Sequence, residues 1–272
     1  MSGLSAKEAN RLALVTGASS GIGSAYAESL ARRGWNLVIV ARSAERLAQK
    51  AAEMTARHSI SIQCLRADLA TNSGISAVER RLETGDVDLL VNNAGFASLA
   101  DFPDETVGAI ERMITVNVTA LTRLTRSAVT AMKRRGAGTI VNVASGLSFN
   151  VMPMAAVYAG TKGFVSQFTQ CLAAELAGDP VRLQLLVPGL TRSNLGDAEK
   201  LGLSNHFPPE AIMEAEAVAE ASIAALSIQE LVCIPRLEDH ADWETASAAI
   251  RRIGIDPPHN ELASRYRALA QN

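Results

Sequence analysis

The chain has 272 residues, of which 48% are hydrophobic and 20% are charged, and its formal net charge is −2. So small a net charge gives no electrostatic case for nucleic acid or an anionic membrane as the main partner. The three cysteines, Cys64, Cys171 and Cys233, are far apart, which suits a reducing compartment and buried thiols better than disulfides or a metal site. No apolar run reaches about 18 residues and no secretion signal begins the chain, so we expect a cytoplasmic protein without a membrane span.

A glycine-rich stretch follows the apolar run at residues 12–15, and a helical pattern begins directly after it. Strand, glycine turn and helix in this order form the context that a dinucleotide-phosphate turn requires. Gly17 would allow the tight turn, Gly21 would let the backbone approach the pyrophosphate, and Gly23 would permit close packing of the helix. Taken alone, the turn could also be an ordinary loop.

The second predicted strand, residues 36–40, ends in Ala41, Arg42 and Ser43. A site that prefers NAD usually has a carboxylate here for the ribose hydroxyls, whereas a site for NADP needs a cation for the additional phosphate. Arginine with a serine hydroxyl beside it therefore favours NADP(H), with NAD(H) as the second choice. The alternative is a solvated Arg42 at the start of a helix.

The next two predicted strands, residues 60–65 and 87–91, are each followed by polar residues. Asp68 comes just past the first of them, where ligands of open α/β sheets bind, so it could accept a hydrogen bond from adenine or cap the following helix. Residues 92–95 are two asparagines, an alanine and a glycine. They suggest a backbone that comes close to the adenosine half of a cofactor, although a plain turn would also explain them.

A long helical region is predicted over about residues 104–135, with Asn117 in its middle. Asparagine competes for backbone hydrogen bonds and is a poor residue for a helix interior, so we expect a local kink there that holds a water. The strand predicted at residues 138–143 follows, and Ser145 lies just beyond its carboxyl end. Ser145 is therefore expected at the ligand-binding edge of the sheet.

Tyr158 and Lys162 are four residues apart on the next predicted helix, so their side chains should lie on one face. A nearby ammonium group stabilises a phenolate and lowers the pKa of the phenol from about 10, which makes the pair a candidate for acid/base chemistry. An ordinary amphipathic helix with a solvated lysine is the alternative for this pair alone. A sixth strand, residues 181–187, ends at Pro188 and Gly189.

Together these motifs resemble the short-chain dehydrogenase/reductase family over about residues 11–193, in the family's order and spacing. The matching residues are Thr16 to Gly23, Asp68, Asn92 to Gly95, Asn117, Ser145, Tyr158, Lys162, Pro188 and Gly189. The resemblance implies a Rossmann-type α/β fold, with a doubly wound parallel sheet of about seven strands and helices on both faces. It also implies that Tyr158 is the general acid/base and that Ser145 hydrogen-bonds the substrate carbonyl.

By the same resemblance, Lys162 would bind the nicotinamide ribose and lower the tyrosine pKa, and Asn117 would hold a water that links Lys162 to solvent. No metal is expected. The expected cofactor-binding residues are Gly17, Ser19, Ser20, Gly21, Ile22, Gly23, Arg42, Ser43, Asp68, Leu69, Asn93, Ala94, Gly95, Tyr158, Lys162, Pro188, Gly189, Leu190, Thr191 and Ser193. The expected substrate-binding residues are Ser145, Phe96, Leu147, Val151, Met154 and Phe207.

We interpret residues 1–272 as one domain, within which residues 194–226 form a substrate-binding flap and helix and residues 235–272 a helical extension. Family members commonly end in a glycine-rich segment that helps to build a tetramer, so the extension leaves open whether this chain forms a homodimer or a homotetramer. The predicted function is NADPH-dependent hydride transfer to the carbonyl of a mainly apolar ketone, reversible as alcohol oxidation. The alternatives are a sugar or polyol dehydrogenase of the same family and a sensor that binds NADP without turnover.

Overall fold

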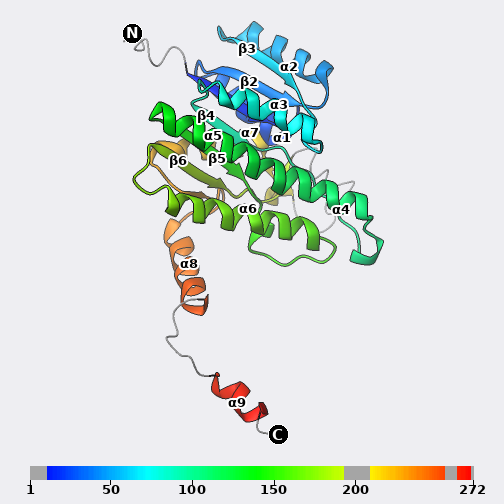
Figure 1. The fold of residues 1–272 in the computed structure, drawn as a ribbon, viewed down its shortest axis with the longest axis vertical. Helices are drawn as coiled ribbons and strands as arrows, with labels where there is room; N and C mark the ends of the chain where they lie inside the picture. Colours follow the sequence, from blue (N-terminus) through cyan, green and yellow to red (C-terminus); the bar gives the residue numbers. More distant parts are fainter. Residues whose placement is uncertain (1–10, 193–208, 255–261, 271–272) are drawn as a thin grey trace. The chain divides into compact units, whose positions relative to one another are not determined.

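The computed structural model describes residues 11–192, 209–254 and 262–270 (Figure 1). By its internal contacts the chain divides into two compact units, Met1–Pro235 and Arg236–Asn272. Among the described residues, the second unit consists of helices α8 (His240–Gly254) and α9 (Ser264–Ala270), in the stretch where a helical extension was predicted. The interpretation of residues 1–272 as one domain stays a prediction.

The first unit is built on a parallel sheet of seven strands in the order β3-β2-β1-β4-β5-β6-β9, which confirms the predicted fold class. The strands are β1 (Leu12–Thr16), β2 (Asn36–Ala41), β3 (Ile62–Arg66), β4 (Leu89–Asn92), β5 (Gly138–Val143), β6 (Val181–Leu186) and β9 (Val232–Cys233). Two residues each of β7 (Thr191–Arg192) and β8 (Met213–Glu214) form a separate small pair. The chain runs outward in opposite directions from β1 and β4, so a crevice for ligands opens between these two strands at their carboxyl ends.

Helices cover both faces of the sheet. Alternate strand residues point to opposite faces, and on each face they pack with the helices in a separate hydrophobic core. The helices are α1 (Gly21–Ala31), α2 (Ala44–Arg57), α3 (Asn72–Glu83), α4 (Val107–Ile114), α5 (Leu121–Arg135), α6 (Ala156–Glu175) and α7 (Ala215–Ser227). Helices α1, α2 and α7 pack on one core, and α3 and α5 pack on the other. In Figure 1, α5 and α6 lie side by side in front of the sheet. Among the described residues, no helix has the length and apolar character needed to span a membrane.

The long helix predicted over residues 104–135 is interrupted in the structure. A single 3-10 turn, η1 (Phe102–Asp104), precedes α4, and a π-helical turn, η2 (Thr115–Ala120), separates α4 from α5. Asn117 is buried inside η2 with 1% of its surface exposed, so the regular α-helix is interrupted at this residue. Helix α7 begins at Ala215, directly after the two extended residues of β8.

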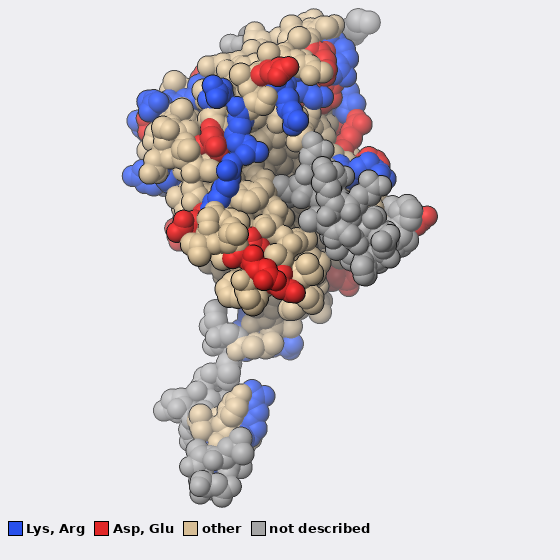
Figure 2. Space-filling view, turned by 90° about the vertical axis from the view of Figure 1, so that its right-hand side faces the viewer, with Lys and Arg blue, Asp and Glu red and all other residues tan. Residues whose placement is uncertain are grey.

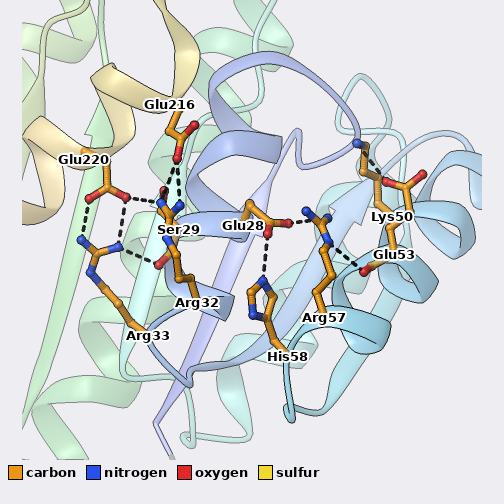
Figure 3. A network of polar contacts seen from close by, with 10 residues as sticks. All are labelled: Glu28, Ser29, Arg32, Arg33, Lys50, Glu53, Arg57, His58, Glu216 and Glu220. Carbon is orange, nitrogen blue, oxygen red and sulfur yellow. Dashed lines mark hydrogen bonds and ion pairs between the residues drawn. The ribbon is translucent and has the colours of Figure 1, made fainter.

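Charged side chains join α1 to both of its neighbouring helices (Figure 3). The contacts pair Arg32 with Glu216 and Glu220, Arg33 with Glu220, and Glu28 with Arg57 and His58. Hydrogen bonds from Arg33 and the neighbouring Arg32 lower the pKa of Glu220 to about 2. Since Glu220 lies on α7 and its partners Arg32 and Arg33 directly follow α1, the ion pairs hold together two helices that are far apart in the sequence.

We predict that Glu220→Gln lowers the free energy of unfolding at pH 7 by about 1 kcal/mol, because a partly exposed ion-pair network contributes little more than that. The depressed pKa means that this contribution is present above about pH 4.5 and is lost as the pH falls towards 2. The free energies of unfolding of wild type and variant, measured with denaturant from pH 7 to pH 2, should therefore converge. Glu83→Gln, on the exposed side of α3, is the control. A difference in the free energy of unfolding that stays constant down to pH 2 would contradict the depressed pKa of Glu220.

Candidate active site

A cleft of about 1120 Å³ opens at the carboxyl ends of the strands. Its lining includes residues that follow β1, β2, β4, β5 and β6, together with two residues of α6. The cleft contains all expected cofactor-binding residues except two. Gly23 packs instead against the glycine turn, and Ser193 lies outside the described residues. Segments that are distant in the sequence thus meet where the topology predicted a ligand crevice.

Tyr158 and Lys162 lie on the inner face of α6, with 7% and 3% of their surfaces exposed. The Ser145 hydroxyl, just beyond β5, lies close enough to the Tyr158 hydroxyl to lower the pKa of the phenol. The Ser145 hydroxyl oxygen also accepts a hydrogen bond of 3.2 Å from the backbone N–H of Leu147, which fixes its position. A hydroxyl pair is thereby held in the cleft, where it can bind a carbonyl oxygen.

The Lys162 ammonium group donates a hydrogen bond of 2.8 Å to the backbone carbonyl of Val143, the last residue of β5. Its nitrogen is 5.9 Å from the centre of the Tyr158 ring. Burial lowers the pKa of Lys162 to about 8, because a charge away from water is costly. Lys162 can therefore release its proton at moderately alkaline pH.

The direction of the Tyr158 pKa differs from the sequence prediction. Burial raises the pKa of the phenol above its ordinary value, and the Ser145 hydroxyl opposes this only in part. The Lys162 ammonium group binds the Val143 carbonyl, and the lowering of the phenol pKa by Lys162 stays a prediction. The phenol consequently keeps its proton near neutral pH, which is the state that a general acid needs.

The Asn117 side chain binds the backbone of the loop that follows β4. Its Nδ2 donates to the Phe96 carbonyl at 3.0 Å and to the Thr161 hydroxyl at 3.1 Å, and its Oδ1 accepts from the Phe96 N–H at 3.1 Å. A Cβ on Gly95 would approach this Oδ1 to 3.0 Å, so a larger residue would strain the contact. Asn117 therefore fixes the loop against α6, and its role in holding a water stays a prediction.

The residues at the start of α1 fit the phosphate groups of a dinucleotide. Gly17 and Gly21 have φ values of 69° and 55°, which favour glycine, and a Cβ on Gly23 would lie 2.5 Å from the Gly17 carbonyl oxygen. Ser20 precedes the helix and its side chain makes no capping hydrogen bond, so the backbone N–H groups of the first turn face the cleft without a side-chain cap. A helix N-terminus of this kind binds anions.

Arg42 and Ser43 line the cleft beyond β2, as the sequence predicted. Ser43 also caps α2, since its hydroxyl oxygen accepts a hydrogen bond of 3.2 Å from the Arg46 N–H. The Arg46 side chain lines the cleft as a second cation, which the sequence analysis missed. Its only signal in the sequence is its position in the first turn of the helix that begins after Ser43.

Asp68 lines the cleft and is not the cap of α3, because Thr71 occupies that position. One Asp68 oxygen accepts from the Ala70 N–H at 3.0 Å, and the other lies 3.8 Å from Arg112 on α4. Arg112 also lies over the ring of Phe96, 5.9 Å from its centre. The sequence offers no signal for Arg112, because only the tertiary fold brings α4 to this position.

Four of the expected substrate-binding residues, Ser145, Phe96, Leu147 and Val151, line the cleft. Met154 does not line the cleft, whereas Met152 does; Met154 is 52% exposed with a φ of 65°, and its contact with substrate stays a prediction. A left-handed residue changes the direction of the chain, which a count along the sequence cannot anticipate. Phe207, like the flap at residues 194–208, lies outside the described residues. Leu99 and Asn150 line the cleft in addition.

The family described as short chain dehydrogenase matches residues 11–202, and the chain belongs to this family of oxidoreductases. The human very-long-chain 3-oxoacyl-CoA reductase is 30% identical over 201 residues, which are 72% of this chain and 64% of the human protein. The chain thus matches less than two thirds of that relative's length. The zebrafish (Danio rerio) very-long-chain 3-oxoacyl-CoA reductase-B is 31% identical over 249 residues, which are 89% of this chain and 77% of that protein.

Two solved structures are similar over 94% of this chain. One is a short-chain dehydrogenase from Sphingobium yanoikuyae in complex with NADPH, with 36% identity, a TM-score of 0.87 and complete coverage of that chain. The other is the bulky-bulky ketone specific alcohol dehydrogenase from Comamonas testosteroni, with 32% identity, a TM-score of 0.84 and 98% coverage. Among the described residues, no group of three or more His, Cys, Asp or Glu side chains could hold a metal ion.

We predict that Lys162→Met changes how stability depends on pH. Burial of the lysine charge costs stability below about pH 8, and this cost disappears as the pH rises towards 10.5, where the unfolded chain also loses the proton. The free energy of unfolding of wild type should therefore rise relative to that of the variant between pH 8 and pH 10.5. Urea unfolding over this range tests it, with Lys50→Met on the outside of α2 as the control. Parallel curves for wild type and Lys162→Met would contradict a buried, destabilised ammonium group.

Proposed function

We propose that the protein is an NADPH-dependent reductase of ketones, reversible as an alcohol dehydrogenase. The observation that carries this proposal is the pair of Ser145 and Tyr158 hydroxyls in a cleft that also contains a dinucleotide-type glycine turn. A protein that only senses NADP has no need for this pair, whereas reduction of a carbonyl requires both a proton donor and a second hydrogen bond to the oxygen.

The chemistry divides between cofactor and chain. When bound, NADPH supplies the hydride that is added to the carbonyl carbon. The Ser145 hydroxyl donates a hydrogen bond to the carbonyl oxygen, and Tyr158 transfers its phenolic proton to the same oxygen as negative charge develops there. Lys162, one turn along α6, stabilises the phenolate that remains, and a water at Asn117 would return a proton to it from solvent.

The choice of NADPH over NADH follows from the two cations beyond β2. Arg42 and Arg46 both line the cleft at the end where the ribose of the adenosine half would lie. The other residues of this stretch that line the cleft, Ala41 and Ser43, carry no carboxylate. Guanidinium groups bind phosphate through paired hydrogen bonds. The similarity to the Sphingobium yanoikuyae enzyme, solved with NADPH, supports this preference, and NADH remains the second choice.

The carbonyl compound is proposed to be mainly apolar. Phe96, Leu99, Leu147, Val151 and Met152 give the cleft near Ser145 an apolar lining. The similarity to the bulky ketone dehydrogenase of Comamonas testosteroni supports a ketone with large substituents. The names of the human and zebrafish relatives favour a second candidate, a 3-oxoacyl thioester, which carries the same ketone chemistry. A sugar or polyol fits the apolar lining less well.

We predict that Tyr158→Phe reduces kcat for ketone reduction roughly a thousandfold, because loss of a general acid typically costs two to four orders of magnitude. The dissociation constant of NADPH should change far less, since the ring and its packing remain. Both values can be measured by following NADPH absorbance and fluorescence. Substantial residual kcat in Tyr158→Phe would remove the phenol from its proposed role.

We predict that Arg42→Ala weakens NADPH binding by about ten- to a hundredfold and NADH binding by much less, since a charge-assisted hydrogen bond to phosphate contributes about 1.5–3 kcal/mol. Arg46→Ala should act in the same direction. Fluorescence titration with both cofactors measures the ratio, and Arg57→Ala, at the far end of the same helix, is the matched control. Equal losses for NADPH and NADH would show that these arginines do not read the phosphate.

A further inference from the structure

The apolar lining of the cleft continues outward onto the surface of the protein. Val151 lines the cleft and is 100% exposed, so this residue belongs both to the cleft lining and to the outer surface. Phe149 and Met154 are two and three residues from Val151 along the chain, and Phe102 is two residues from Ala100, whose N–H binds the Met154 carbonyl; these three side chains are 42%, 52% and 64% exposed, respectively. We call these four residues the lip. Large exposed apolar side chains scattered singly are common, but a group that continues a binding cleft indicates a ligand surface.

The lip is held in place by hydrogen bonds to the body of the protein. The Ala100 N–H donates to the Met154 carbonyl at 3.1 Å, which joins the segment that leads into η1 to the loop before α6. The Ser148 hydroxyl donates to the Lys162 carbonyl at 2.9 Å. A non-glycine residue with φ 65°, such as Met154, persists only where its surroundings impose that conformation. The lip is therefore a formed surface rather than an accidental exposure of loose loop residues.

The lip also lies next to acidic residues. Asp101 and Asp104 flank Phe102 and are exposed. The opposite end of the cleft is basic, since Arg42 and Arg46 line it. On the face drawn in Figure 2, the upper part of the first unit carries Lys and Arg interspersed with Asp and Glu, and a patch of Asp and Glu lies below them. An anionic group placed at the lip would be repelled, whereas a neutral apolar group would not.

We propose that the lip binds a neutral, extended apolar substituent of the ketone substrate, so that the substrate class is neutral ketones with one long or bulky apolar arm. The carbonyl would lie at Ser145 and Tyr158, and the arm would leave the cleft across Val151 towards Phe102 and Met154. This inference rests on the proposed ketone reductase function. It excludes substrates whose distal part carries several negative charges, such as a coenzyme A thioester.

The test measures kcat/KM with NADPH for neutral methyl ketones of increasing chain length. For wild type, kcat/KM should rise about twofold for each methylene that lies on the lip, which corresponds to burying about half of its surface. Val151→Ser and Phe102→Ser should flatten this rise and lower the ratio of long-chain to short-chain kcat/KM by about tenfold. Ile228→Ser, which removes a 73% exposed apolar side chain at the end of α7, should keep the wild-type ratio.

A second arm compares neutral 3-oxo esters with 3-oxoacyl coenzyme A thioesters of the same chain. The neutral ester should have the higher kcat/KM. The double variant Asp101→Asn, Asp104→Asn should narrow the difference in kcat/KM between the ester and the coenzyme A thioester. Reduction of ketones at a rate independent of chain length, or a chain-length dependence that Val151→Ser and Phe102→Ser leave intact, would overturn the lip while the reductase function stands. Failure of NADPH to reduce any ketone in the series would overturn the proposed function itself.

Discussion

The site depends on the hydrogen bond between the Lys162 ammonium group and the Val143 carbonyl. This bond joins the middle of α6 to the last residue of β5, so it fixes how the helix lies against the end of the sheet. Tyr158 is one turn earlier on the same helix face, and Ser145 is two residues beyond the strand. One buried contact therefore brings together a phenol, a hydroxyl and an ammonium group. Burial is costly for Lys162, and the fold accepts this cost at the place where we propose that a proton moves.

Around this contact the cleft separates two kinds of ligand chemistry. Its basic end has Arg42 and Arg46 for phosphate, and its other end is apolar with acidic residues outside it. A cofactor that carries phosphates and a neutral substrate would thus each find the end that suits its charge. The orientation of a bound cofactor and substrate in the cleft would follow from this charge asymmetry as much as from Ser145 and Tyr158.

The sequence predicted the features that depend on local spacing. The glycine turn and the placement of Tyr158 and Lys162 on one helix face follow from short-range patterns, and the structure bears them out. Features that depend on distant contacts were missed. Arg112 reaches Asp68 only because α4 packs beside the cleft, and the pKa of Tyr158 rises because the surrounding fold buries it. Met152 replaces Met154 in the lining because of one left-handed residue.

The most direct measurement of the central claim is a crystal structure of the protein with NADPH and an unreactive ketone analogue. The account predicts that the analogue's oxygen lies within about 2.6–3.2 Å of both the Tyr158 and Ser145 hydroxyl oxygens, with its carbonyl-like carbon facing the nicotinamide. The Lys162 ammonium group would lie beside the ribose. An oxygen bound away from Tyr158, or a tyrosine hydroxyl turned from Ser145 once the cleft is filled, would contradict it.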